Sequence, residues 1–207
     1  LYASSKAEWN GAEISQETNY PWDGRIGISL KMKNPATFTL ALRIPEWVRG
    51  RPLPSDLYVY ENDEPAKWSV AVNGTPVKEP MMKNGYALLE REWKSGDTVE
   101  LNLPMPIRRV KANPDVQALK GQVAFERGPI VFAFEGIDQQ TALPWNQWGV
   151  SSKAKVSANF QKDLLGGVET IRIEDGENVF TGIPYACWAN RGQTPMRVWL
   201  DDTDVKK

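Results

Sequence analysis

The chain has 207 residues, of which 41% are hydrophobic and 25% are charged, and its formal net charge is −1. This composition supports a buried core and argues against both a disordered chain and a nucleic-acid partner, which needs a basic surplus. No apolar run approaches the roughly 20 residues of a membrane-spanning helix, so no membrane partner is expected.

The N-terminal half shows the two-residue periodicity of strands. Apolar and polar side chains alternate over residues 25–31 and 38–44, and the Asn-Pro turn between them predicts a hairpin. Residues 49–67 are polar and contain three prolines, which predicts a long loop. Asn-Gly pairs at 73–74 and 84–85 then mark tight turns, and turns recurring about every ten residues are typical of a β-sandwich.

The C-terminal half begins with a helix signal. Asn113-Pro114-Asp115 offers an N-cap and a proline at the first helical position, which predicts one short helix near 114–119 and no other. Alternation resumes in the segments beyond it, and we predict that residues 141–152 form a loop and that Met196–Leu200 is the last strand.

These patterns predict an all-β chain of two antiparallel, jelly-roll-like β-sandwich domains. The helix signal separates two strand-rich halves, which places the first sandwich at 1–110 and the second at 111–194.

The sequence contains no His and a single Cys, Cys187. Histidine is the commonest general base and metal ligand, and a zinc site made from carboxylates alone would be a poor match to that metal. We therefore predict no catalytic, cofactor-binding or metal-binding residue in this chain. Cys187 lies in an apolar run and is predicted to be a buried structural thiol.

Carboxylates are the remaining acid or base groups. Glu90 and Glu92 share one face of a predicted strand, where a glycosidase-type pair is one interpretation and a solvated strand face is the favoured one. Glu126 and Glu135 are interpreted as ion-paired or surface acids, and Asp23 as the residue that closes a turn.

The chain contains nine Trp residues. Trp serves both as core and as a flat platform for sugars, so the count alone does not choose between these roles. Trp145 and Trp148 in the predicted loop, and Trp22 in a turn, are the candidates for carbohydrate contact. Most of the others are expected to pack in the core or on a sheet.

Several ordered strings along the chain together carry a family resemblance. They are Gln16–Gly24 (QETNYPWDG), Leu42–Trp47 (LRIPEW), Val72–Gly74, Gly85-Tyr86 through Trp93, Gly96-Asp97, Leu103–Pro106 (LPMP), Glu126–Pro129 (ERGP), and Ile183–Gly192 (IPYACWANRG). In this order they resemble the C-terminal region of the β-L-arabinofuranosidase family, glycoside hydrolase family 127 and its relatives, formerly a domain of unknown function.

The resemblance implies an (α/α)6-barrel catalytic domain upstream, which holds a zinc-bound Cys nucleophile and a Glu acid/base. Neither position exists here, and Cys187 lies outside the metal motif. The resemblance therefore implies a non-catalytic region of a glycoside hydrolase acting on arabinose-containing glycans, with zinc confined to the absent domain. It further suggests that residues 195–207 return to complete the first sandwich.

The expected role is structural support of the catalytic domain, which is the main expected partner, with a homodimer contact as a further one. The alternative is an autonomous carbohydrate-binding module that uses Trp145, Trp148 or Trp22 to bind a glycan. The sequence starts at Leu1, and we expect it to begin inside a longer polypeptide. Cytoplasmic, periplasmic and secreted locations therefore all remain open.

Overall fold

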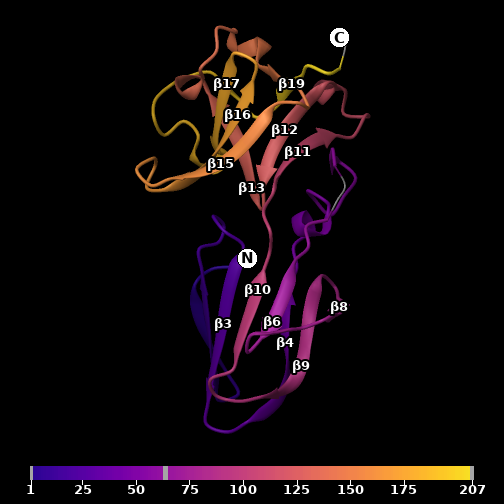
Figure 1. Cartoon of the computed structure of the whole chain (residues 1–207), viewed down its shortest axis with the longest axis vertical. Helices are drawn as coiled ribbons and strands as arrows, with labels where there is room; N and C mark the ends of the chain where they lie inside the picture. The colour runs from indigo at the N-terminus through magenta and orange to yellow at the C-terminus, as the bar shows by residue number, and fades with distance from the viewer. Residues whose placement is uncertain (1, 63–64, 206–207) are drawn as a thin grey trace. The chain divides into compact units, whose positions relative to one another are not determined.

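A computed structural model of the chain describes residues 2–62 and 65–205. It divides into an N-terminal unit, Leu1–Gly50 with Glu64–Met105, and a C-terminal unit, Arg51–Asp63 with Pro106–Lys207. Both units are built from strands, and the helical segments of the described residues are short 3-10 turns (Figure 1). The all-β prediction is confirmed.

The strands of the N-terminal unit form two antiparallel sheets, which pack as a sandwich. One sheet has the order β1-β2-β3-β10-β6-β7 and the other β4-β9-β8. The elements are β1 (Ser5–Trp9), β2 (Ala12–Thr18), β3 (Arg25–Met32), β4 (Ala36–Arg43), the 3-10 turn η1 (Glu46–Arg49), β6 (Ser69–Val72), β7 (Thr75–Pro76), β8 (Met81–Lys83), β9 (Tyr86–Trp93) and β10 (Thr98–Asn102).

The core of this unit lies between its two sheets. Ile26, Ile28 and Leu30 of β3 point inward and pack in one cluster with Leu89 and Trp93 of β9. The alternation of residues 25–31 therefore predicted the buried face correctly. The predicted hairpin with 38–44 is wrong, because β3 pairs with β2 and β10 while β4 pairs with β9 in the opposite sheet.

Gly24 fixes the point where the turn of residues 19–24 meets the end of β10. The amide of Leu103 donates to the carbonyl of Gly24 at 2.8 Å. A Cβ atom at position 24 would overlap the carbonyl oxygen of Leu103, so this approach of two backbones requires glycine.

The C-terminal unit is built around a sheet of order β14-β19-β12-β13-β17-β16-β15, in which β11 also pairs with β12 and with β5. Its elements are β5 (Tyr58–Tyr60), β11 (Ile107–Ala112), the 3-10 turn η2 (Gln117–Leu119), β12 (Gln122–Arg127), β13 (Ile130–Glu135), η3 (Gly136–Asp138), η4 (Trp145–Gln147), β14 (Gly149–Val150), β15 (Lys155–Gln161), β16 (Val168–Asp175), β17 (Asn178–Pro184), η5 (Tyr185–Cys187), β18 (Met196–Arg197) and β19 (Leu200–Asp202). The pairings are antiparallel except for the short β14–β19 pair.

The C-terminal end of the chain corrects the predicted domain bounds. Residues 195–207 were expected to complete the first sandwich, but β18 pairs with β13, and β19 pairs with β12 and β14, all in the C-terminal unit. Along the sequence, the boundary between the two units falls between residues 105 and 106 rather than between 110 and 111. The predicted short helix near 114–119 is the 3-10 turn η2.

The predicted loop of residues 49–67 contributes a strand to the C-terminal unit. Val59 of β5 pairs with Lys111 of β11. Glu61, directly after β5, forms ion pairs with Lys111 at 2.6 Å and with Arg109, and both cations also pair with Asp202 of β19. This charged cluster ties the 51–63 segment to the second unit.

None of the helical segments among the described residues has the length and hydropathy needed to cross a membrane.

Candidate functional site

The Glu90–Glu92 pair lies on β9 and is solvent-exposed together with the intervening Arg91. Glu90 stands opposite Thr39 and Glu92 opposite Thr37 on β4. Neither carboxyl is enclosed in a buried acid/base site, so the geometry matches the solvated strand face rather than a glycosidase pair.

Glu126 and Glu135 are both buried, which contradicts the surface interpretation of these acids. Glu126 on β12 accepts a hydrogen bond from the Tyr60 hydroxyl, and burial raises the pKa of its carboxyl to about 8. Glu135 at the end of β13 forms an ion pair with Arg191 at 2.6 Å, which confirms the ion-pair interpretation for this residue.

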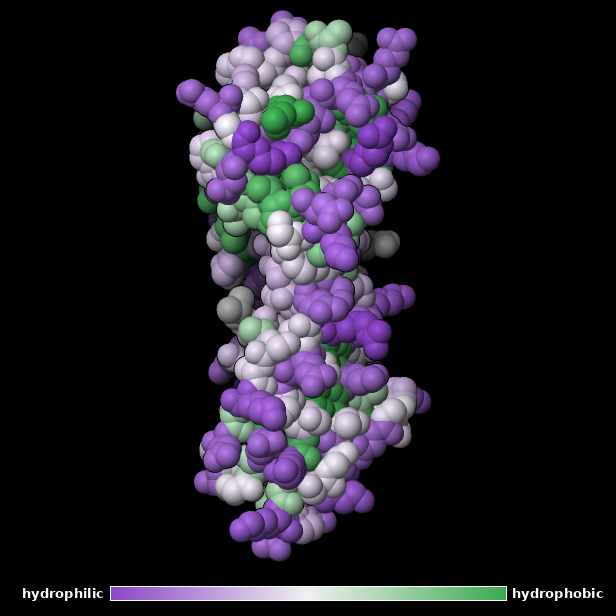
Figure 2. Space-filling model, turned by 90° about the vertical axis from the view of Figure 1, so that its left-hand side faces the viewer, coloured by the Kyte–Doolittle hydropathy of each residue, from purple (hydrophilic) through white to green (hydrophobic). Residues whose placement is uncertain are grey.

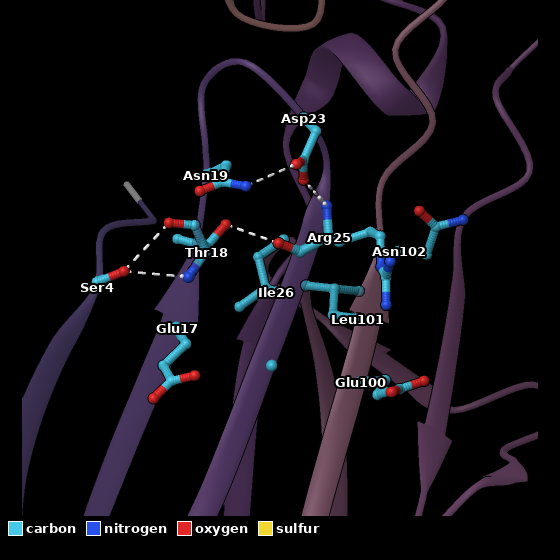
Figure 3. Close-up of a pocket in the computed structure, with 11 residues that line it drawn as sticks. Ser4, Glu17, Thr18, Asn19, Asp23, Arg25, Ile26, Glu100, Leu101 and Asn102 are labelled. Atoms are coloured by element: carbon cyan, nitrogen blue, oxygen red, sulfur yellow. Dashed lines mark hydrogen bonds between the residues drawn. The ribbon is translucent and has the colours of Figure 1, made fainter.

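A polar hollow of about 750 Å³ lies on the outer face of the six-stranded sheet of the N-terminal unit (Figure 3). Hydrogen bonds fix one end of it. The Asp23 carboxylate accepts from the Arg25 amide at 2.9 Å and from the Asn19 side chain at 3.3 Å, which confirms Asp23 as a turn-closing residue. The Thr18 hydroxyl donates to the Arg25 carbonyl at 2.7 Å.

The floor of the hollow is set by strand register. Gly27 of β3 stands between Glu17 of β2 and Glu100 of β10, and Arg25 stands opposite Asn102. Directly paired residues share a face and neighbouring strands lie about 4.8 Å apart, so the two carboxylates flank a strip with no side chain, about 10 Å across between their Cα atoms.

The side chains around this strip are free to bind a ligand. Among the described residues, Glu17, Glu100, Asn102 and the guanidinium of Arg25 make no side-chain hydrogen bond or ion pair within the protein. They supply carboxylate and amide acceptors together with amide and guanidinium donors, which is the set that vicinal hydroxyl groups require. This candidate site is not visible in the sequence, because its members lie on three strands and only the strand pairing brings them together.

The three Trp residues predicted to contact carbohydrate differ in exposure. Trp145 in η4 is 52% exposed and Trp148 is 4% exposed. The Trp148 indole N–H donates to the Leu143 carbonyl at 3.3 Å and its ring packs near Phe180. Trp148 therefore has no free ring face, and the prediction for it does not hold. Trp22 is half-buried in the turn beside Asp23, and its role stays a prediction.

Tyr185 and Trp188, which follow β17, form an exposed aromatic pair. Their rings stack with centroids 6.3 Å apart and an interplanar angle of 25°. Tyr185 is 46% and Trp188 42% exposed, so Trp188 is not among the Trp residues that pack in the core. Cys187 between them is only half-buried, in contrast to the buried thiol predicted.

The side chains that could bind a metal ion are scattered over the two units. Among residues 2–62 and 65–205, no three His, Cys, Asp or Glu side chains group in a way that could hold a metal ion. The zinc that the family resemblance implies has no matching ligand set in this part of the chain.

Two family models match consecutive parts of the chain. Residues 1–105 match the β-L-arabinofuranosidase GH127 middle domain, and residues 107–201 match the glycoside hydrolase family 127 C-terminal domain. The chain belongs to glycoside hydrolase family 127. The boundary between the two matches agrees with the division of the structure at 105–106.

Relatives of this GH127 chain are about three times as long. The non-reducing end β-L-arabinofuranosidase of Bifidobacterium longum subsp. longum is 31% identical over 96% of this chain, which spans 32% of that protein. A solved GH127 β-arabinofuranosidase is 37% identical with a TM-score of 0.89, over 98% of this chain and 34% of its own. A GH127 β-L-arabinofuranosidase from Geobacillus stearothermophilus T6 is 35% identical with a TM-score of 0.81, over 98% and 33%.

Proposed function

We propose that this chain is the non-catalytic β region of a longer β-L-arabinofuranosidase-type enzyme and that it supports a catalytic part lying outside it. The observation that carries the proposal is the match to a middle and a C-terminal domain in proteins of which the chain spans about one-third. The candidate acids support it, since Glu126 and Glu135 are held in internal contacts and the Glu90–Glu92 pair is solvated.

A hydrolysis assay tests whether catalysis lies outside this chain. The chain alone and a full-length GH127 relative are incubated with an aryl β-L-arabinofuranoside, and release of the aryl alcohol is followed. We expect turnover from the full-length enzyme and none above background from the chain. Turnover by the chain that is lost in Glu90→Gln or Glu126→Gln would place catalysis here and end the proposal.

Carbohydrate contact at the polar hollow is the second candidate function. Its support is the combination of an open strip at Gly27 with uncommitted donors and acceptors on both sides. A hollow of this volume falls in the range of small-molecule sites, and its polar lining favours a hydroxyl-rich ligand over an apolar one. Trp145 is the other exposed candidate, in the C-terminal unit.

An NMR titration of the chain with an arabinose-containing oligosaccharide checks this second candidate. We expect saturable shifts confined to the amides around Gly27, and a loss of affinity of at least about tenfold in Gly27→Val. A Cβ at position 27 meets only the Glu17 carbonyl at an ordinary 3.8 Å, so this variant fills the strip without straining the strand.

Glu92→Gln on the opposite sheet is the matched control for Glu100→Gln. Only the Glu100 variant should weaken binding. Shifts that instead cluster at Trp145 and disappear in Trp145→Ala would move the carbohydrate site to that residue.

A further inference from the structure

The aromatic pair Tyr185–Trp188 lies on a loop whose following residues bind the buried Glu135 carboxylate. Ala189 adopts a positive φ of 62°, and its amide donates to the Glu135 carboxylate at 2.6 Å. Arg191 binds the other oxygen of the same carboxylate at 2.6 Å and also binds Asp138. The chain directly after Trp188 is therefore anchored at two points to one buried acid.

The network beneath the loop contains one cation, Arg191, and two carboxylates, of which Glu135 is buried. The Glu135 side chain is 1% exposed, and the ion pairs with Asp138 and Glu135 raise the pKa of the Arg191 guanidinium above its ordinary value. Burying charge costs free energy unless every partner is present. The rings stack on each other and the backbone after Trp188 is anchored, which lowers the entropy lost when a partner binds them.

The turn η3, whose Asp138 is bound by Arg191, carries an exposed apolar side chain. Ile137, which lies between the two acids bound by Arg191, is 59% exposed. The Asn190 side chain donates to the carbonyls of Cys187 and Trp188, so it is already engaged. In Figure 1 the gold segment that follows β17 runs along the side of the C-terminal unit that Figure 2 turns toward the reader, where hydrophobic patches lie among hydrophilic residues.

The aromatic pair suits a different kind of ligand from the polar hollow. A sugar needs hydrogen-bonding groups beside a stacking face, and here the Asn190 amide nitrogen and the Arg191 guanidinium already donate to groups within the protein. Exposed Tyr and Trp side chains are typical of the anchors of protein–protein contacts.

We propose that Tyr185, Trp188 and Ile137 form the surface on which the rest of the GH127 enzyme packs, namely the part of the polypeptide that this chain does not contain. The occupant follows from length, because the relatives carry about twice as much chain again outside the matched region. The inference rests on the proposed function and adds to it the place of contact.

Hydroxyl-radical footprinting read by mass spectrometry tests the contact. The isolated chain and the full-length enzyme that contains it are labelled side by side. We expect the oxidation rates of Tyr185 and Trp188 to fall at least about fivefold in the full-length enzyme. Trp93, buried in the core of the N-terminal unit, is the internal reference that stays unlabelled in both.

Equal labelling of the two rings in both forms would overturn the inference. Protection that appears in the isolated chain on raising its concentration would also overturn it, since the occupant would then be a second copy. Failure of the proposed function shows separately, as hydrolysis by the chain alone.

Discussion

Replacing Arg191 by Met is expected to lower the free energy of unfolding of the C-terminal unit by about 3–5 kcal/mol. Arg191 is the cation that neutralises the buried Glu135 and also pairs with Asp138. Met keeps the volume and removes the charge, which leaves the buried Glu135 carboxylate with the hydrogen bond from the Ala189 amide but without its cation. Denaturant unfolding of the chain measures the loss.

Two further variants identify the cause of that loss. Arg172→Met removes an exposed ion pair with Glu174 in the same unit and should leave the free energy of unfolding nearly unchanged. The double variant Glu135→Gln with Arg191→Met removes both charges and should recover most of the stability. A double variant as unstable as Arg191→Met alone would show that the effect comes from packing and not from an unpaired charge.

Replacing Glu126 by Gln is expected to stabilise the chain at alkaline pH. Burial raises the pKa of the Glu126 carboxyl to about 8, above the value of about 4.3 for an unfolded chain. The folded state therefore binds more protons than the unfolded state between these two values, and stability falls as pH rises through this window.

The size and pH dependence of the Glu126 effect follow from linkage. Each pKa unit corresponds to about 1.4 kcal/mol, so the cost of ionising Glu126 reaches roughly 3–5 kcal/mol above pH 8. Gln cannot ionise and still accepts the hydrogen bond from the Tyr60 hydroxyl, so the variant should gain about this amount at pH 9 and little at pH 5. A gain of equal size at both pH values would contradict the burial of an ionisable group here. Glu92→Gln on the exposed face of β9 is the control.

The sequence predicted which faces of strands are buried more reliably than which strands pair. Alternation at Ile26, Ile28 and Leu30 identified the inward face of β3 because side chains in a strand point alternately to opposite sides. The same alternation carries no information on partners, so β3 and β4 were predicted to pair although they lie in opposite sheets. The strand β5 was missed because its three residues, Tyr58–Tyr60, are too few to show a period.

The candidate sites were harder to predict because their parts are distant in the sequence. Tyr60 and Glu126 are 66 residues apart, and Glu135 and Arg191 are 56 apart, so a buried acid looked like a surface one. Trp148 and Cys187 show the same limit. A loop position suggested exposure for Trp148, which is buried, and an apolar run suggested burial for Cys187, which is only half-buried.

The support role is tested most directly by deleting the region that corresponds to residues 1–201 from a full-length GH127 enzyme and measuring thermal unfolding and β-L-arabinofuranosidase activity. We expect the truncated enzyme to unfold at least about 10 °C lower than the full-length enzyme, or to precipitate, because its docking surface is left uncovered. A truncated enzyme with an unchanged unfolding temperature and full activity would contradict the proposed support role.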